Sequence, residues 1–133
     1  MSLKPLRIAV VMDPIEDIKP RKDTTLAMLL AAQRRGWELH YLELPGIWLR
    51  DGVALGRAHP IGVREHDSDW FTRGAPVTRP LCDFDVILIR KDPPFDTEYI
   101  YSTYILERAE VQGALVVNRP DGLRDMNEKV YTA

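Results

Sequence analysis

Three short apolar runs restrict the possible folds of this chain more than any other feature. They span residues 6–12, 84–90 and 114–118. Each run is apolar at nearly every position, is rich in β-branched side chains, and lacks the alternation of polar and apolar residues that marks a half-exposed strand. Such runs are typical of strands buried on both faces, as in a parallel sheet that helices cover on both sides.

Helical patterns separate these strands along the chain. Helices are predicted over residues 24–35 and 97–112, each starting at a residue that can cap a helix and each followed by a glycine that ends it. A further strand is predicted over residues 37–44. This order of elements predicts an α/β fold with three layers, in which a mostly parallel, Rossmann-like sheet is flanked by helices.

The segment between the two halves of this pattern is less regular. Asp51-Gly52 lies between the apolar stretches 47–50 and 53–55, and this predicts a β-hairpin with a type I′ turn. Residues 63–65 have strand character, whereas residues 74–80 contain two prolines and are predicted to form a loop.

Composition excludes several classes of protein. A chain of 133 residues fits one domain with one core. Its net charge of −2 arises from 18 basic and 20 acidic side chains spread along the sequence, so it has no basic footprint for nucleic acid. No apolar run approaches the roughly 20 residues that span a bilayer. The one cysteine, Cys82, cannot form an internal disulfide, which fits the cytoplasm, and we expect its side chain to be buried.

The last residues predict a helix that has only begun. Asp121 or Asp125 can cap it, and neither glycine nor proline ends it before residue 133. We therefore expect the chain to belong to a longer protein. The alternative is a C-terminal helix that frays at its end.

Charged residues follow two of the buried strands. Asp13-Pro14 comes directly after the first strand, and Arg90 and Asp92 precede the double proline 93–94 after the second. Because ligands bind outside the carboxyl ends of strands in open α/β sheets, these residues predict one shared site. Asp13 is a candidate to accept a hydrogen bond from a ligand amine, or else it stabilises its own turn. Arg90 is a candidate to hold a carboxylate bidentately, or else it pairs with Asp92 to brace the loop.

Other chemically capable residues carry weaker signals. His40, His59 and His66 lack the spacing of metal ligands, and no metal site is predicted. No GxGxxG pattern and no Walker P-loop is present. The predicted second helix carries tyrosines at 99, 101 and 104, which form either part of its core-facing side or a surface that packs on another subunit.

A family resemblance follows from several blocks taken together. These are Val11-Met12-Asp13-Pro14-Ile15, the helix around Ala27-Met28-Leu29-Leu30, the block Arg90 to Glu98, and Leu123-Arg124-Asp125 with Asn127-Glu128-Lys129. Together they resemble the amino-terminal domain of prokaryotic glutathione synthetase. The resemblance extends over almost the whole chain and is weakest in residues 45–80.

The resemblance implies the fold, the chemistry and the ligands of the parent enzyme. Residues 1–128 would be a pre-ATP-grasp substrate domain, and residues 129–133 the start of an ATP-grasp domain. The enzyme would join γ-glutamylcysteine to glycine with ATP and Mg²⁺ through an acyl phosphate. Asp13, Arg90 and Asp92 would bind substrate, and Lys129 would reach the nucleotide. No residue of the chain is predicted to be catalytic.

The same resemblance sets limits and leaves alternatives. No cofactor site would be complete in this segment, so we expect it to be inactive alone. The parent enzyme would be cytoplasmic and homo-oligomeric, without nucleic-acid or membrane partners. The alternatives are a domain of another ATP-grasp carboxylate–amine ligase and a non-catalytic binding domain that associates with itself.

Overall fold

Eight strands, two α-helices and three short 3-10 helices follow one another in the part of the chain that the structure describes. The computed structural model describes residues 5–12, 14–17, 24–66, 69–90 and 97–118. The strands are β1 (Arg7–Met12), β2 (Glu38–Leu42), β3 (Ile47–Arg50), β4 (Val53–Val63), β5 (Phe71–Arg73), β6 (Val77–Pro80), β7 (Val86–Arg90) and β8 (Leu115–Asn118). The α-helices are α1 (Thr24–Arg34) and α2 (Thr97–Val111), and the 3-10 helices are η1 (Ile15–Asp17), η2 (Leu44–Gly46) and η3 (Leu81–Asp83).

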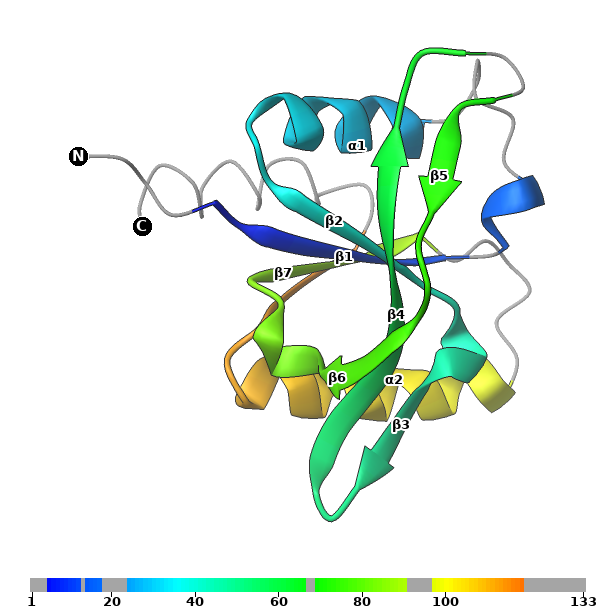
Figure 1. Cartoon of the computed structure of the whole chain (residues 1–133). Coiled ribbons are helices and arrows are strands. Elements are labelled where there is room, and N and C mark those ends of the chain that lie inside the picture. Colours follow the sequence, from blue (N-terminus) through cyan, green and yellow to red (C-terminus); the bar gives the residue numbers. More distant parts are fainter. Residues whose placement is uncertain (1–4, 13, 18–23, 67–68, 91–96, 119–133) are drawn as a thin grey trace.

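The strands form one mixed sheet in the order β3-β4-β2-β1-β7-β8. β2, β1, β7 and β8 are mutually parallel and make up its centre and one edge. β4 pairs antiparallel with β2, and β3, β5 and β6 all pair antiparallel with β4. The long β4 crosses the sheet and carries the other three strands (Figure 1). The α/β class and the parallel centre are therefore confirmed, and the antiparallel half makes the sheet mixed.

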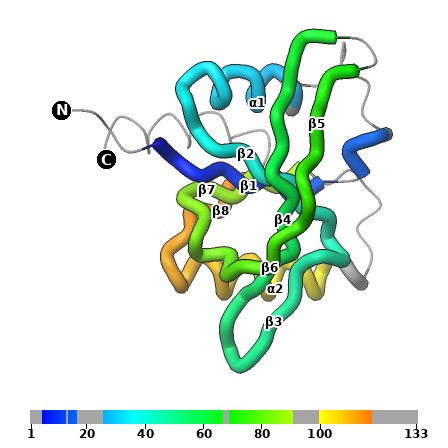
Figure 2. Tube along the Cα trace, viewed as in Figure 1, coloured from blue at the N-terminus to red at the C-terminus, as the bar shows by residue number. Residues whose placement is uncertain are grey.

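Two cores lie on opposite faces of the sheet. Ile8 and Val10 of β1 face α1, and Ala9 and Val11 face α2, and all four are essentially inaccessible to solvent. This arrangement explains why β1 is apolar on both of its faces from Ile8 to Met12. The two helices lie on either side of the strands (Figures 1 and 2), as the three-layer prediction requires.

The predicted hairpin between β3 and β4 is confirmed. Asp51 and Gly52 have φ values of 51° and 79°, and positive φ at both central residues is what a type I′ turn needs. The prediction of a loop over residues 74–80 is wrong in part, because Val77–Pro80 forms β6. Pro80 is tolerated there because it is the last residue of a short strand.

One burial prediction is wrong, and one of the two alternatives for the tyrosines of α2 does not hold for Tyr101 and Tyr104. Cys82 is exposed, because Leu81 and not Cys82 is the residue that η3 buries in the core. Tyr101 and Tyr104 of α2 are 56% and 60% exposed, so they do not form the core-facing side of the helix. The buried side of α2 consists of smaller or aliphatic residues, namely Ser102, Ile105, Leu106 and Ala109.

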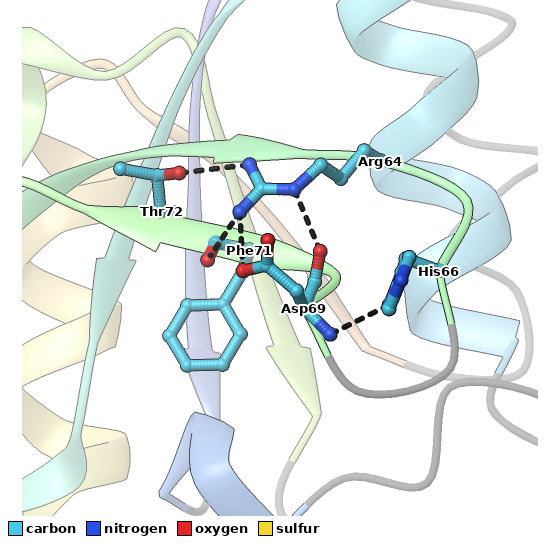
Figure 3. Close-up of polar contacts among 5 residues, drawn as sticks. All are labelled: Arg64, His66, Asp69, Phe71 and Thr72. Atoms are coloured by element: carbon cyan, nitrogen blue, oxygen red, sulfur yellow. Dashed lines mark hydrogen bonds and ion pairs between the residues drawn. The ribbon is translucent and has the colours of Figure 1, made fainter.

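An arm extends from the sheet where β4 pairs with β5. Ile61 lies opposite Arg73 and Val63 opposite Phe71 in this pairing. Arg64 closes the described end of the arm: its guanidinium donates to Asp69 Oδ1 at 2.6 Å and to the hydroxyl of Thr72 at 2.8 Å (Figure 3). We call residues 61–66 and 69–73 the β4–β5 arm.

None of the described helices combines the length and the apolar character needed to cross a membrane.

Candidate functional site at the carboxyl ends of the parallel strands

The carboxyl ends of the parallel strands lie in one row. β1 and β7 are neighbours, and their register pairs Met12 with Arg90. β2 lies on the other side of β1, with Leu42 opposite Val11, and β8 lies beyond β7. The crevice outside such a row is the usual place for a ligand in an open α/β sheet.

Of the four site residues predicted from sequence, the structure describes Arg90. Arg90 is the last residue of β7 and is half-buried. Asp13 follows Met12 directly in the sequence, but Asp13, Asp92 and Lys129 lie outside the described residues. The structure thus confirms that the strands preceding the two predicted charged turns end side by side. The binding roles of these four residues stay predictions.

A tyrosine from β2 anchors the chain just beyond β1. The backbone N–H of Ile15 donates a hydrogen bond to Tyr41 Oη at 3.0 Å, and both residues are fully buried. Burial raises the pKa of Tyr41 above its ordinary value; the Ile15 hydrogen bond opposes this rise, and the Glu43 and Glu16 carboxylates add to it. Tyr41 therefore stays a neutral phenol that accepts the hydrogen bond from Ile15.

An arginine from β5 holds the same turn from the surface. Arg73 Nη1 lies 2.7 Å from Glu16 Oε1, next to Ile15 in η1. The Arg73 guanidinium also lies 5.9 Å from the centre of the Tyr41 ring, a cation–π distance. The His59 ring of β4 lies 5.9 Å from the same ring. Segments that are far apart in sequence therefore meet at η1.

Sequence reasoning gave no role to Tyr41, Arg73 or Glu16. No local pattern links them, because only the pairing of Ile61 with Arg73 in the β4–β5 arm brings Arg73 to the turn after β1. The one available signal was Glu16, an acidic residue close to a predicted strand end. That signal does not identify its partner.

The described residues contain no group of three or more His, Cys, Asp and Glu that is arranged to hold a metal ion. His40 is a core residue of β2, with its ring 5.1 Å from that of Phe84 and its Nε2 3.5 Å from Glu38 Oε1. Burial lowers the pKa of His40, and the contact with Glu38 opposes this effect only in part. His40 is therefore neutral in the folded protein at neutral pH.

These observations define the protein as an α/β domain whose candidate ligand site lies at the carboxyl ends of parallel strands. The particular family follows from comparison with known proteins. Residues 6–124 match the family described as "Prokaryotic glutathione synthetase, N-terminal domain", and the chain belongs to that family.

Three similar proteins are all named glutathione synthetase. The one from Yersinia pestis is 56% identical over 128 residues, which are 96% of this chain and 40% of the relative. The one from Salmonella typhimurium is 54% identical over 96% of this chain and 41% of the relative. The one from Shewanella oneidensis is 51% identical over the same shares. The chain thus spans about two fifths of the length of the relatives it matches.

Proposed function

We propose that this chain is the substrate-side domain of an ATP-dependent glutathione synthetase, which ligates γ-glutamylcysteine to glycine. One observation carries the proposal: a protein named glutathione synthetase is 56% identical over 96% of the chain. The fold supports it, because the matched residues include both strand ends at which the site is proposed. The domain would have the pre-ATP-grasp fold, and residues 129–133 would begin the ATP-grasp domain.

The substrate would lie across the ends of β1 and β7. γ-Glutamylcysteine carries an amine and carboxylates, so it needs an acceptor and a cation at neighbouring positions. In this proposal Asp13 accepts from the amine, and Arg90 donates to a carboxylate through its planar guanidinium. Asp92 is the third substrate-binding residue of the proposal. The adjacency of Met12 and Arg90 in the sheet supports this arrangement.

ATP and Mg²⁺ are the cofactors that the proposal requires, and the described residues do not fit either of them. They include no group of three or more His, Cys, Asp and Glu placed so that it could hold a metal ion. Gly52 lies in a hairpin turn and Gly56 is packed against Leu42 and Leu81, so neither belongs to a phosphate-binding loop at a helix N-terminus. We therefore place both cofactors outside the residues of this chain that the structure describes. Lys129 is the residue of this chain proposed to reach the nucleotide.

Self-association and location are further parts of the proposal. Ile100, Tyr101 and Tyr104 of α2 are between 53% and 60% exposed, and large exposed apolar side chains that cluster on one helix are typical of an interface. We propose that a second copy covers this surface in a homo-oligomer. We place the enzyme in the cytoplasm, where an exposed and unpaired Cys82 is compatible with the redox conditions.

The alternatives differ from the proposal in measurable ways. Another ATP-grasp ligase would use a different amine in place of glycine. A non-catalytic binding domain would associate with itself and would support no ligation. The family match favours the glutathione synthetase over both.

A chimaera tests the proposal directly. The 128 matching residues of the Yersinia pestis protein are replaced by those of this chain, and ATP-dependent release of phosphate is measured with γ-glutamylcysteine and glycine. Ligation that requires both substrates is the expected result. The 133-residue chain alone is expected to show none. A folded chimaera that releases no phosphate contradicts the proposal, and release with another amine but not with glycine favours the other ligase.

A further inference from the structure

We infer that Arg73, acting through Glu16 and together with Tyr41, is a positioning residue for the substrate-binding turn after β1. The inference rests on the proposed function and extends it, because none of these three side chains belongs to the site predicted from sequence. The proposed ligand residue Asp13 is one residue beyond β1 and two residues before Ile15. Whatever fixes Ile15 and Glu16 therefore limits where Asp13 can lie.

The residues on both sides of Asp13 are anchored. Met12 is 3% exposed and pairs with Arg90 in the sheet. Ile15 is fully buried, and its N–H is satisfied by the Tyr41 hydroxyl at 3.0 Å. A backbone fixed at two points so close together restricts the two residues between them, and preorganisation of this kind strengthens binding by reducing the ordering cost.

Arg73 supplies the outer half of this anchor. It joins Glu16 at 2.7 Å and lies over the Tyr41 ring at 5.9 Å, so one guanidinium contacts both the turn and its buried support. The Arg73 and Glu16 side chains are 36% and 48% exposed, so both are accessible to solvent but not fully so. An ion pair of this kind contributes little to overall stability. Its position beside the proposed site is what distinguishes it.

The β4–β5 arm is built to present Arg73 firmly. Arg64 makes hydrogen bonds to the Asp69 carboxylate and backbone carbonyl, to the Thr72 hydroxyl and to the Phe71 carbonyl (Figure 3). These bonds tie the strand that carries Arg73 to the end of β4. An arm stiffened in this way holds the guanidinium at Glu16 at low entropic cost.

The chain also offers a matched control. Arg34 Nη2 lies 2.9 Å from Glu65 Oε1, and this pair links α1 to the same arm. Like the Arg73–Glu16 pair, it joins an arginine and a glutamate at the surface. Unlike that pair, it contacts neither Tyr41 nor η1. Loss of Arg34 therefore weakens the arm without releasing the turn.

The test measures substrate kinetics in the chimaera. We expect Arg73→Ala to raise KM for γ-glutamylcysteine about fivefold, equivalent to about 1 kcal/mol, with KM for ATP unchanged. Arg73→Lys should restore most of the affinity, because it keeps the charge beside Glu16. Glu16→Gln should raise the same KM, and the double variant Glu16→Gln/Arg73→Ala should be no worse than Arg73→Ala alone. Arg34→Ala should leave every constant unchanged.

Several results overturn the inference. An Arg73→Ala variant overturns it if its KM for γ-glutamylcysteine equals that of Arg34→Ala. A variant that lowers kcat alone, or that raises KM for γ-glutamylcysteine and KM for ATP equally, also overturns it. A merely structural role of Arg73 predicts those patterns. Additive effects of Glu16→Gln and Arg73→Ala also contradict it. If the unmodified chimaera folds but does not ligate, the proposed function fails and this inference fails with it. If the chimaera ligates and Arg73→Ala is silent, only this inference fails.

Discussion

The side-chain amide of Gln33 makes two hydrogen bonds with the backbone of Val63, in the way that a neighbouring strand would. Gln33 Nε2 donates to the Val63 carbonyl at 2.7 Å, and the Val63 N–H donates to Gln33 Oε1 at 2.8 Å. At the other end of β4, the Ala54 N–H donates to Gln112 Oε1 at 3.2 Å. One glutamine from each α-helix region therefore holds an end of the strand from which the antiparallel half of the sheet is built.

Replacing Gln33 is expected to loosen the β4–β5 arm. Gln33→Leu removes both hydrogen bonds to Val63, whose side chain is buried, and two backbone groups lose their partner. We expect a loss of about 1–2 kcal/mol in the free energy of unfolding, measured by urea denaturation. Arg34→Ala is the control, because its exposed ion pair should be worth under about 1 kcal/mol. Equal destabilisation by the two variants would argue against a special role of the amide.

Gly56 is expected to tolerate no side chain. A Cβ at this position would lie 2.6 Å from Cδ2 of both Leu42 and Leu81, two side chains that are fully buried. Because both buried leucine side chains would have to shift, we expect Gly56→Ala to cost about 1–3 kcal/mol in thermal or urea unfolding. Gly62→Ala is a matched control in the same strand, since its nearest neighbour would be Gln33 Oε1 at 3.7 Å. Two variants of equal stability would contradict the packing argument.

How far sequence alone predicts this structure depends on how far apart in the sequence the interacting residues lie. The strands of the parallel centre and the Asp51-Gly52 turn follow from local patterns, namely apolar runs and the φ > 0 requirement of a type I′ turn. The ladder of β4 with β6 does not, because it joins Arg57 to Thr78 across an intervening segment, and the sequence of β6 contains prolines at or beside its ends. β6 is a strand because it pairs with β4.

The candidate site divides in the same way. The sequence predicts that Asp13 and Arg90 lie at strand ends, because each apolar run stops where charged residues and proline follow. The contact between Arg73 and Glu16 is not visible, because it depends on the register of the β4–β5 arm. His40 shows a further limit. His40 and Tyr41 are neighbours in β2 and so face opposite sides of the sheet, yet both are buried because each face of the sheet is covered.

His40 is expected to make the fold sensitive to mild acid. Burial lowers its pKa below the ordinary 6.5, and Arg79 adds to this effect while Glu38 opposes it. The unfolded chain therefore binds a proton at His40 at a higher pH than the folded chain does. The stability that the neutral ring contributes is complete above pH 6.5 and falls as the pH drops below that value toward the folded pKa.

The measurement is urea unfolding between about pH 7.5 and 5, with His40→Phe as the test variant. The unmodified chain should lose stability across this range, and the variant should lose less. Glu38 does not interfere: although burial alone would raise its pKa, the Arg7 and His40 contacts outweigh that effect and lower the pKa below 4.5, so its contribution changes only at lower pH. If the two proteins lost stability in parallel as the pH falls, His40 would have the same pKa in the folded and the unfolded chain, which would contradict the prediction.

The exposed face of α2 is expected to mediate self-association. Tyr101→Ser/Tyr104→Ser removes two large aromatic side chains that are 56% and 60% exposed, and it should shift an oligomer toward monomer in sedimentation velocity. Glu110→Ser is the control on the same helix, because Glu110 is exposed but, at about 100° per residue, lies on another side of α2 than Ile100 and Tyr104. An unmodified chain that is monomeric at every concentration, or a double variant that associates as before, would contradict the proposed interface.

Arg90 decides between a ligand-binding and a bracing role at the end of β7. If it binds a substrate carboxylate, Arg90→Ala in the chimaera should raise KM for γ-glutamylcysteine about tenfold or more, equivalent to at least about 1.4 kcal/mol, and leave KM for ATP unchanged. Arg90→Lys should recover only part of the loss, because an ammonium cannot make the paired hydrogen bonds of a guanidinium. Lys129→Ala is the reciprocal control and should raise KM for ATP alone. Unchanged kinetics in a less stable Arg90→Ala protein would instead assign Arg90 to bracing the strand end, and the carboxylate would then have to be held by another cation of the site.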